Sequence, residues 1–206
     1  NGIATAMEGA FALPLWVSGV VLAALTAAVI LGGITRIGAV AEKLVPAMCV
    51  LYIVCVLWVL GVFFDRIPAA FELIITQAFA PTAAVGGFAG STMLMAMRMG
   101  VARGIFSNEA GLGTAGIAQA AGQSTSPVFS GLVGMMGTFI DTIIVCTMTG
   151  LAIVVSGVWN SGASGALLST QGFEAAMPGV GKYVLALSLA VFAFTTILGW
   201  AYYGEK

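Results

Sequence analysis

The strongest constraint on this chain is a series of long apolar runs that carry no charged residue. Such runs cover residues 14–31, 46–64 and 183–203. A helix needs about 20 residues to cross the hydrocarbon core of a membrane. Over 206 residues, 60% are apolar and only 7% are charged, and a water-soluble core of this size cannot hide that much apolar surface. The sequence therefore predicts an all-α polytopic membrane protein and excludes a soluble globular domain or a disordered chain.

Proline and glycine mark the ends of the expected membrane spans. Pro14 stands at the start of the first run, and Gly32 and Gly33 follow its end. A run at 81–97 is shorter and interrupted by glycines, whereas the run at 127–157 exceeds one crossing and is expected to tilt or to begin outside the lipid. The five expected spans cover residues 14–31, 46–64, 81–97, 127–157 and 183–203. We also expect short helices outside the membrane at 67–79 and around 170–177.

The basic residues predict the orientation in the membrane, because lysine and arginine favour the cytoplasmic side. With five alternating spans, five of the seven basic residues fall on one side and two on the other. This tally places residue 1 outside and residue 206 in the cytoplasm of a cell (plasma) membrane. The first group comprises Arg36, Lys43, Arg98, Arg103 and Lys206, and the second comprises Arg66 and Lys182.

The missing residue types exclude several functions. The chain contains no histidine, the usual general base and zinc ligand. Its three cysteines lie inside apolar runs and form no metal-binding or disulfide pattern. A net charge of −1 leaves no basic patch for nucleic acid. The sequence also lacks paired acidic residues within the spans, which disfavours an intramembrane enzyme. We therefore expect no catalytic residue. A passive channel is an alternative, and an electrophysiological current would reveal it.

Asp141 is the one charged residue well inside an expected span. A charge near mid-membrane costs at least a few kcal/mol, so such a residue is a candidate for function by default. In an α-helix Thr138, Thr142 and Thr149 would share its face. The alternatives are an acid that takes part in transport or gating, and an acid that only holds neighbouring helices together.

Glycines concentrate at 86–91 within the short third span. Glycine costs about 1 kcal/mol in a helix interior relative to alanine. Several glycines in one short span therefore indicate a structural or functional role. Gly86 and Gly90 form the spacing used for tight helix packing. The alternative is a broken helix whose free backbone groups bind a small substrate. In that case the candidates for substrate binding are Gly86, Gly87, Phe88, Gly90 and Ser91.

The last span presents Phe192, Thr195, Thr196 and Trp200 on one helical face. Two adjacent hydroxyl groups and a nearby carbonyl offer oxygen ligands of the kind that hard cations prefer. Alternatively, each threonine hydroxyl bonds a carbonyl one turn back in its own helix.

A glycine-rich turn at 103–113 contains Ser107 beside Glu109. Without histidine or a phosphate-binding lysine, neither a catalytic serine nor a phosphate site is favoured. We expect a structured cytoplasmic turn in which Glu109 pairs with Arg103 or Arg98.

The stretch at 100–113 closely resembles the hallmark of the sodium:alanine/glycine symporter family of amino acid carriers. The segments 33–46, 139–149 and 192–206 are similar to the same family, so the resemblance covers essentially the whole chain. Since the chain opens on Asn1 and stops after an apolar run, we expect a fragment of a longer transporter.

The resemblance implies a leucine-transporter-like fold with two inverted five-helix repeats, of which this chain would hold core helices four to eight. The third span would then be the broken sixth helix, which favours the substrate-binding interpretation of 86–91. The fifth span would supply Thr195, Thr196 and the Phe192 carbonyl to a sodium ion. Thr196 and Trp200 would face the amino acid, and Phe88 and Trp200 would limit its size.

The function implied by the resemblance is sodium-coupled symport of alanine or glycine by alternating access. Asp141, Glu109 and Arg103 are the candidates for coupling or gating. A proton-coupled or exchange-type amino acid transporter of the same architecture is the alternative, with Asp141 or Glu109 as the proton carrier.

Overall fold

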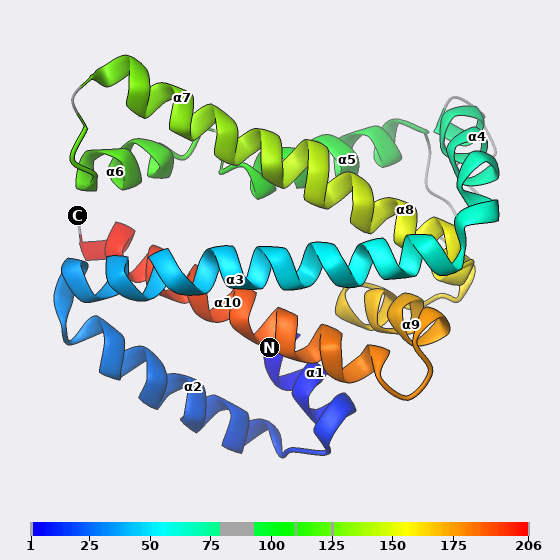
Figure 1. The fold of residues 1–206 in the computed structure, drawn as a ribbon, viewed down its shortest axis with the longest axis horizontal. Coiled ribbons are helices and arrows are strands. Elements are labelled where there is room, and N and C mark those ends of the chain that lie inside the picture. Colours follow the sequence, from blue (N-terminus) through cyan, green and yellow to red (C-terminus); the bar gives the residue numbers. More distant parts are fainter. Residues whose placement is uncertain (1, 79–92, 110, 125, 206) are drawn as a thin grey trace. The chain divides into compact units, whose positions relative to one another are not determined.

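The computed structural model describes residues 2–78, 93–109, 111–124 and 126–205. All regular secondary structure in these residues is helical, which confirms the prediction of an all-α chain. The chain divides into two compact units, which we describe separately (Figure 1). Unit 1 comprises residues 1–63 and 163–206, and unit 2 comprises residues 64–162.

Unit 1 is built around its last helix. Its helices are α1 (Gly2–Phe11), α2 (Leu15–Ile30), α3 (Gly33–Val62), α9 (Ala166–Ala176) and α10 (Gly181–Glu205). Helix α10 packs against each of the other four (Figure 1). Its Leu185 and Leu198 are 1% exposed, and Val56 and Val59 of α3 have no exposed surface. Apolar packing between α3 and α10 therefore forms the core of this unit.

An aromatic cluster ties α9 to this core. The ring of Tyr52 on α3 stacks with Phe173 of α9 at 6.1 Å and meets Phe192 of α10 edge to face at 5.5 Å. Both arrangements are favourable for aromatic rings. The packing of its ring against Tyr52 therefore fixes Phe192 relative to α3.

Helix α3 begins at Gly33, well before Pro46, where the sequence suggested that a span starts. The helix continues through Pro46, although an interior proline removes one backbone hydrogen bond. Membrane helices tolerate such prolines when neighbouring groups satisfy the freed carbonyl. The segment expected to be a loop, with Arg36 and Lys43, is therefore the first part of this helix.

The turn between α9 and α10 is held by a close backbone approach and by one carboxylate. A Cβ atom on Gly181 would lie 2.4 Å from the carbonyl carbon and oxygen of Phe173, so only glycine fits there. The Glu174 carboxylate accepts hydrogen bonds from the N–H groups of Gly179 at 2.6 Å and Lys182 at 3.0 Å. It thereby caps the start of α10, where unpaired N–H groups favour negative charge. These bonds, first that from Gly179, lower the pKa of Glu174 below its ordinary value of 4.5.

Unit 2 contains shorter helices and one long interrupted one. Its helices are η1 (Phe64–Arg66), α4 (Ile67–Ala78), α5 (Met93–Ser107), α6 (Thr114–Ala121), α7 (Pro127–Thr138), η3 (Phe139–Cys146), α8 (Thr147–Val155) and η4 (Val158–Asn160). Helices α4 and α9 lie where the sequence suggested short helices outside the spans. Ser126 caps α7, because its hydroxyl accepts a hydrogen bond from the Val128 N–H at 3.3 Å.

Helices α7, η3 and α8 run without a break from Pro127 to Val155, but the middle stretch, η3, is a π-helix. A π-helix bonds residue i to i+5 and is frequently found at functional sites. The α-helical periodicity that placed Thr138 and Thr149 on the face of Asp141 does not hold across such a stretch. Thr149 instead donates to the carbonyl of Val145 in its own helix at 2.7 Å.

Two basic side chains make local contacts near helix ends. The Arg66 guanidinium donates to the carbonyl of Val155 at 3.3 Å, at the C-terminal end of α8. The Lys182 ammonium lies 5.0 Å from the centre of the Tyr183 ring, within the range of a cation–π contact.

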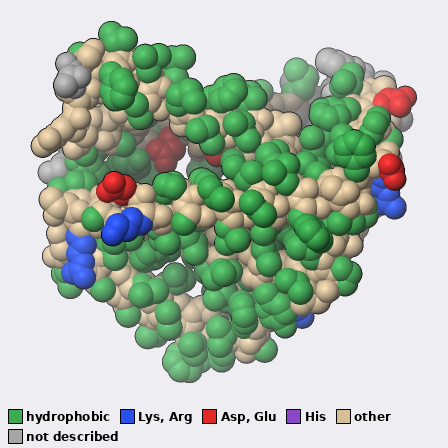
Figure 2. Space-filling view, in the orientation of Figure 1, with side chains coloured by type: hydrophobic (Ala, Val, Ile, Leu, Met, Phe, Trp, Pro, Cys, Tyr) green, Lys and Arg blue, Asp and Glu red, His purple; other side chains and the backbone are tan. Residues whose placement is uncertain are grey.

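Three helical segments in the described residues are long and apolar enough to cross a membrane, namely Gly33–Val62, Pro127–Val155 and Gly181–Glu205. Large apolar side chains are widely exposed, among them Leu31 at 87% and Trp16 at 72%. Figure 2 shows hydrophobic side chains over most of the face that it draws, with charged side chains in a few small groups. Such a surface suits lipid and not water. The chain is thus an all-α membrane protein.

Candidate functional site

The three sequence-predicted sodium ligands lie together on α10. The hydroxyls of Thr195 and Thr196 each donate to the Phe192 carbonyl oxygen, in both cases at 2.8 Å. The Thr195 hydroxyl also lies 3.2 Å from the Val191 carbonyl oxygen and 3.8 Å from the Met48 sulfur of α3. The hydroxyls thus bond carbonyls of their own helix, as the alternative interpretation of the sequence expects, and the role of the three oxygens as sodium ligands stays a prediction.

The chemistry of this cluster is that of neutral oxygen donors. A hydroxyl that donates its proton to a carbonyl keeps lone pairs that can bind a cation. In the described residues no three His, Cys, Asp or Glu side chains gather where they could hold a metal ion. The α10 cluster therefore fits a monovalent cation better than a divalent one, and further ligands would have to come from another segment.

Thr196 and Trp200 occupy the open side of α10. Thr196 is exposed, and Trp200 is 45% exposed with its ring 5.9 Å from that of Tyr203. Thr195, by contrast, is half-buried toward α3. One face of α10 thus presents a hydroxyl and an indole that unit 1 leaves accessible.

The other candidates for substrate binding lie outside the described residues. They are Gly86, Gly87, Phe88, Gly90 and Ser91. Their assignment stays a prediction from the sequence.

In unit 2 the structure brings two motifs together that lie 34 residues apart. The Ser107 hydroxyl, at the end of α5, donates to Oδ2 of Asp141 at 2.5 Å. The Thr142 hydroxyl donates to the side-chain oxygen of Asn108 at 2.9 Å, and the Asn108 amide donates to the Gly104 carbonyl at 3.0 Å. The only charged residue well inside an expected span is therefore bonded to the glycine-rich turn.

Glu109 does not make the ion pair expected from the sequence. It lies in the left-handed backbone region, with φ of 51°, where the chain reverses direction. Its carboxylate accepts a hydrogen bond from the buried hydroxyl of Thr114. Arg103 is exposed, and among the described residues the structure shows Thr114, and not an arginine, as the partner of this carboxylate. The carboxylate is thus bonded to a neutral hydroxyl where the sequence predicted an arginine.

Sequence reasoning missed the polar partners of Asp141. The sequence predicts Ser107 as part of a structured turn and places Thr142 on the face of Asp141, without a partner from another segment for either residue. Adjacent polar residues occur at 107–109 and at 141–142, in each case beside apolar residues. This pattern could have suggested that the two segments bond to each other.

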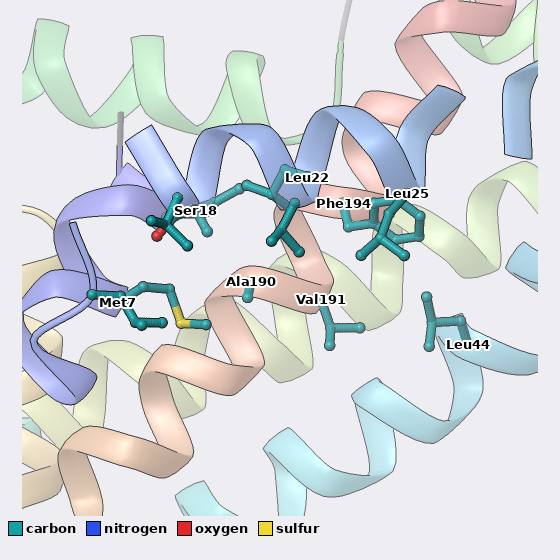
Figure 3. Close-up of a pocket in the computed structure, with 12 residues that line it drawn as sticks. Met7, Ser18, Leu22, Leu25, Leu44, Ala190, Val191 and Phe194 are labelled. Atoms are coloured by element: carbon teal, nitrogen blue, oxygen red, sulfur yellow. The ribbon is translucent and has the colours of Figure 1, made fainter. Parts of the chain in front are cut away.

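A cavity of about 340 Å³ lies in unit 1 between α1, α2, α3 and α10. Figure 3 shows Met7, Leu22, Leu44 and Phe194 around it, together with Ser18. All lining side chains except Ser18 are apolar, and the Ser18 hydroxyl is buried without a hydrogen-bond partner among the described residues. An amino acid zwitterion needs hydrogen bonds to both of its charged groups. This cavity is therefore not a substrate site.

Comparisons with known proteins give the chain its family. The model of the sodium:alanine symporter family matches residues 1–206. An uncharacterized transporter of Haemophilus influenzae is 45% identical in an alignment covering all of this chain and 46% of that protein. The sodium/alanine symporter AgcS of Methanococcus maripaludis is 43% identical, over all of this chain and 45% of its own length.

A third relative is the putative sodium/proton-dependent alanine carrier protein YrbD of Bacillus subtilis, 36% identical over all of this chain and 44% of its own length. The chain thus spans less than half the length of the relatives that it matches. The family match nevertheless extends from the first residue to the last, over helices suited to a membrane. The chain belongs to the sodium:alanine symporter family of membrane transporters.

Proposed function

We propose that the intact protein performs sodium-coupled symport of a small neutral amino acid, alanine or glycine, by alternating access. The observation that carries this proposal is the meeting of the Thr195 and Thr196 hydroxyls at the Phe192 carbonyl. Family membership and the sodium/alanine symporter named among its relatives support the same function.

In this proposal sodium binds Thr195, Thr196 and the Phe192 carbonyl, together with ligands from another segment. The amino acid contacts Thr196 and Trp200 on the open face of α10. The broken-helix residues 86–91 bind its charged groups, and Phe88 with Trp200 limits the size of its side chain. The shared residue Thr196 is therefore the physical link between ion and substrate.

Coupling follows from linkage between the two ligands. Sodium binds one conformation of the carrier better than the other and shifts the population toward it. If this conformation also binds the amino acid better, each ligand increases the affinity for the other by the same factor. Asp141, Glu109 and Arg103 are proposed as the coupling or gating groups.

We further propose that residue 1 lies outside and residue 206 lies in the cytoplasm of a cell (plasma) membrane. The excess of basic residues on one side of the expected spans supports this orientation. Labelling of single cysteines at 36 and 162 with a membrane-impermeant maleimide on intact cells tests it. Only position 162 is expected to react.

The ion site is tested by Thr196→Ala in the purified protein, reconstituted in proteoliposomes. We expect sodium-driven uptake of labelled alanine to fall. The half-saturating sodium concentration should rise about tenfold or more, because the sodium ion loses one oxygen ligand. Thr196→Ser keeps the hydroxyl and should restore most of the sodium affinity.

The matched control is Thr170→Val on α9, where the hydroxyl donates to the Ala166 carbonyl in its own helix at 2.8 Å. It should leave the sodium dependence of uptake unchanged. An unchanged sodium dependence in Thr196→Ala would refute the assigned ion site.

A proton-coupled carrier is the second candidate. The half-buried Asp141 within a candidate span favours it, as does a relative named sodium/proton-dependent. Uptake of labelled alanine in sodium-free buffer under an imposed pH gradient separates the two. The sodium proposal expects background uptake there, whereas the proton proposal expects accumulation that Asp141→Asn abolishes.

A further inference from the structure

The turn after α5 and the π-helical stretch η3 are joined in register. Ser107 bonds Asp141, and the next residue, Asn108, bonds Thr142, with the same separation of 34 residues in both bonds. Asn108 is itself fixed, because its amide donates to the Gly104 carbonyl one turn earlier. Two adjacent residues of one segment thus hold two adjacent residues of the other.

The π-helical winding explains why Ser107 reaches this place. The Ser107 oxygen lies 2.5 Å from Asp141 Oδ2 and 4.0 Å from the Cys146 sulfur. Residues 141 and 146 are five apart, which is the spacing that a π-helical hydrogen bond joins. In an α-helix the same two residues would be about 140° apart around the axis. The contact with both side chains therefore requires the π-helical form of η3.

The bond to Asp141 is the shorter of the two, at 2.5 Å against 2.9 Å. A hydrogen bond to an ionised carboxylate is roughly twice as strong as one between neutral groups. Asp141 and Thr142 are half-buried, and η3 contains no fully buried side chain that could fix its rotation by packing. Within η3 itself, the two polar contacts are thus the interactions that hold the Asp141 carboxylate against another segment.

We propose that Ser107 and Asn108 are positioning residues, which hold the Asp141 carboxylate and the π-helical form of η3 in the arrangement that transport requires. This inference rests on the proposed symport, and it assigns a role to two residues that are neither proposed sodium ligands nor proposed substrate-binding residues.

The first test is a double-mutant cycle with Ser107→Ala and Asp141→Asn in the reconstituted intact protein. Ser107→Ala should lower the maximal rate of alanine uptake on the order of tenfold, the value of one hydrogen bond to a charged group, and leave KM for alanine unchanged. Because Ser107 acts through Asp141, the double variant should be no slower than Asp141→Asn alone. Ser107→Thr, which keeps the hydroxyl, should restore the rate.

The matched control is Ser130→Ala on α7, a half-buried serine of the same long helical segment outside both contacts. It should transport as the unmodified protein does. Additive losses in the cycle, or failure of Ser107→Thr to restore the rate, would overturn the positioning role.

The second test does not depend on transport. In a Cys49→Ser, Cys55→Ser background, Ser107→Cys places a thiol beside the native Cys146. A short bifunctional thiol reagent should link residues 107 and 146 within one chain, as read by mass spectrometry of the digested protein, whereas Ser130→Cys should give no link to Cys146. Absence of the 107–146 link overturns the inference. A link in a protein that takes up no alanine with sodium supports the contact and refutes the proposed function instead.

Discussion

Unit 1 and unit 2 hold their helices together by different means. In unit 1, α10 packs through side chains such as Leu185 and Leu198, which are 1% exposed. In unit 2, α7 and η3 contain no buried side chain, and η3 meets the end of α5 through the Ser107–Asp141 and Asn108–Thr142 hydrogen bonds. Apolar packing dominates the first unit, and polar contacts between segments dominate this part of the second.

The hydroxyl groups on α10 and those at the contact between α5 and η3 differ in the same sense. On α10, Thr195, Thr196 and Ser188 donate to carbonyls of their own helix. In unit 2, Ser107 and Thr142 donate to side chains of a distant segment. A hydroxyl that donates to a carbonyl of its own helix keeps lone pairs on its oxygen that can bind a ligand. A hydroxyl that donates to another segment instead fixes the relative position of the two segments. The two regions are thus suited to different tasks in a carrier.

The largest contrast should come from two glycine-to-alanine variants. Gly181→Ala in unit 1 places a Cβ atom 2.4 Å from the Phe173 backbone and should cost about 1–3 kcal/mol or more. Gly131→Ala in α7 meets no atom within 4 Å and should gain up to about 1 kcal/mol from helix propensity. Thermal unfolding in detergent, followed by tryptophan fluorescence, measures both. A loss of stability in Gly131→Ala would end the comparison, since that face of α7 would then be tightly packed.

A smaller contrast should come from two threonine-to-valine variants. Thr142→Val removes a hydrogen bond between segments and leaves the Asn108 oxygen without that donor, so we expect a loss of about 0.5–1.5 kcal/mol. Thr170→Val removes a bond within α9 alone and should be nearly neutral. The same unfolding assay applies. Equal effects would mean that hydroxyl bonds within and between segments contribute alike.

The smallest effect concerns the acidic cap of α10 in unit 1. Because the folded protein lowers the pKa of Glu174 below 4.5, the cap contributes its full stability above about pH 4.5 and loses it as the pH falls through the lower folded value. Glu174→Gln should lower the melting temperature slightly at pH 7 and flatten its decline below pH 4.5. A difference between the two proteins that stays constant from pH 7 to pH 3 would contradict this role of the carboxylate.

The sequence predicts helices where punctuation residues and apolar length agree. Pro14 and Gly32 bracket α2, and the all-α class followed from composition alone. The start of α3 was missed because Arg36 and Lys43 were interpreted as loop residues, although charged side chains on an exposed helical turn are compatible with helix. The π-helical form of η3 could not be predicted, because residues 139–146 contain no proline or glycine that would mark a change of winding.

Of the candidate site, the α10 cluster was predictable because its members lie three and four residues apart in one helix. The Ser107–Asp141 contact was not, because it joins segments whose approach depends on tertiary structure. The Glu109–Arg pairing was wrong in kind: opposite charges suggested a salt bridge, but the left-handed turn at Glu109 brings Thr114 to its carboxylate.

The contact between Arg66 and the Val155 carbonyl bears on how the proposed topology is established. On the proposed outer side the chain has two cations, Arg66 and Lys182, and each has a local partner: a helix-terminal carbonyl for the first and the Tyr183 ring for the second. In the folded protein the partial negative charge at the C-terminal end of α8 partly compensates the charge of Arg66. Because the excess of basic residues on one side sets the orientation, Arg66→Glu and Lys182→Glu increase that excess and should leave the orientation unchanged. Charge reversal at Arg36 and Lys43 reduces the excess and should produce inverted molecules.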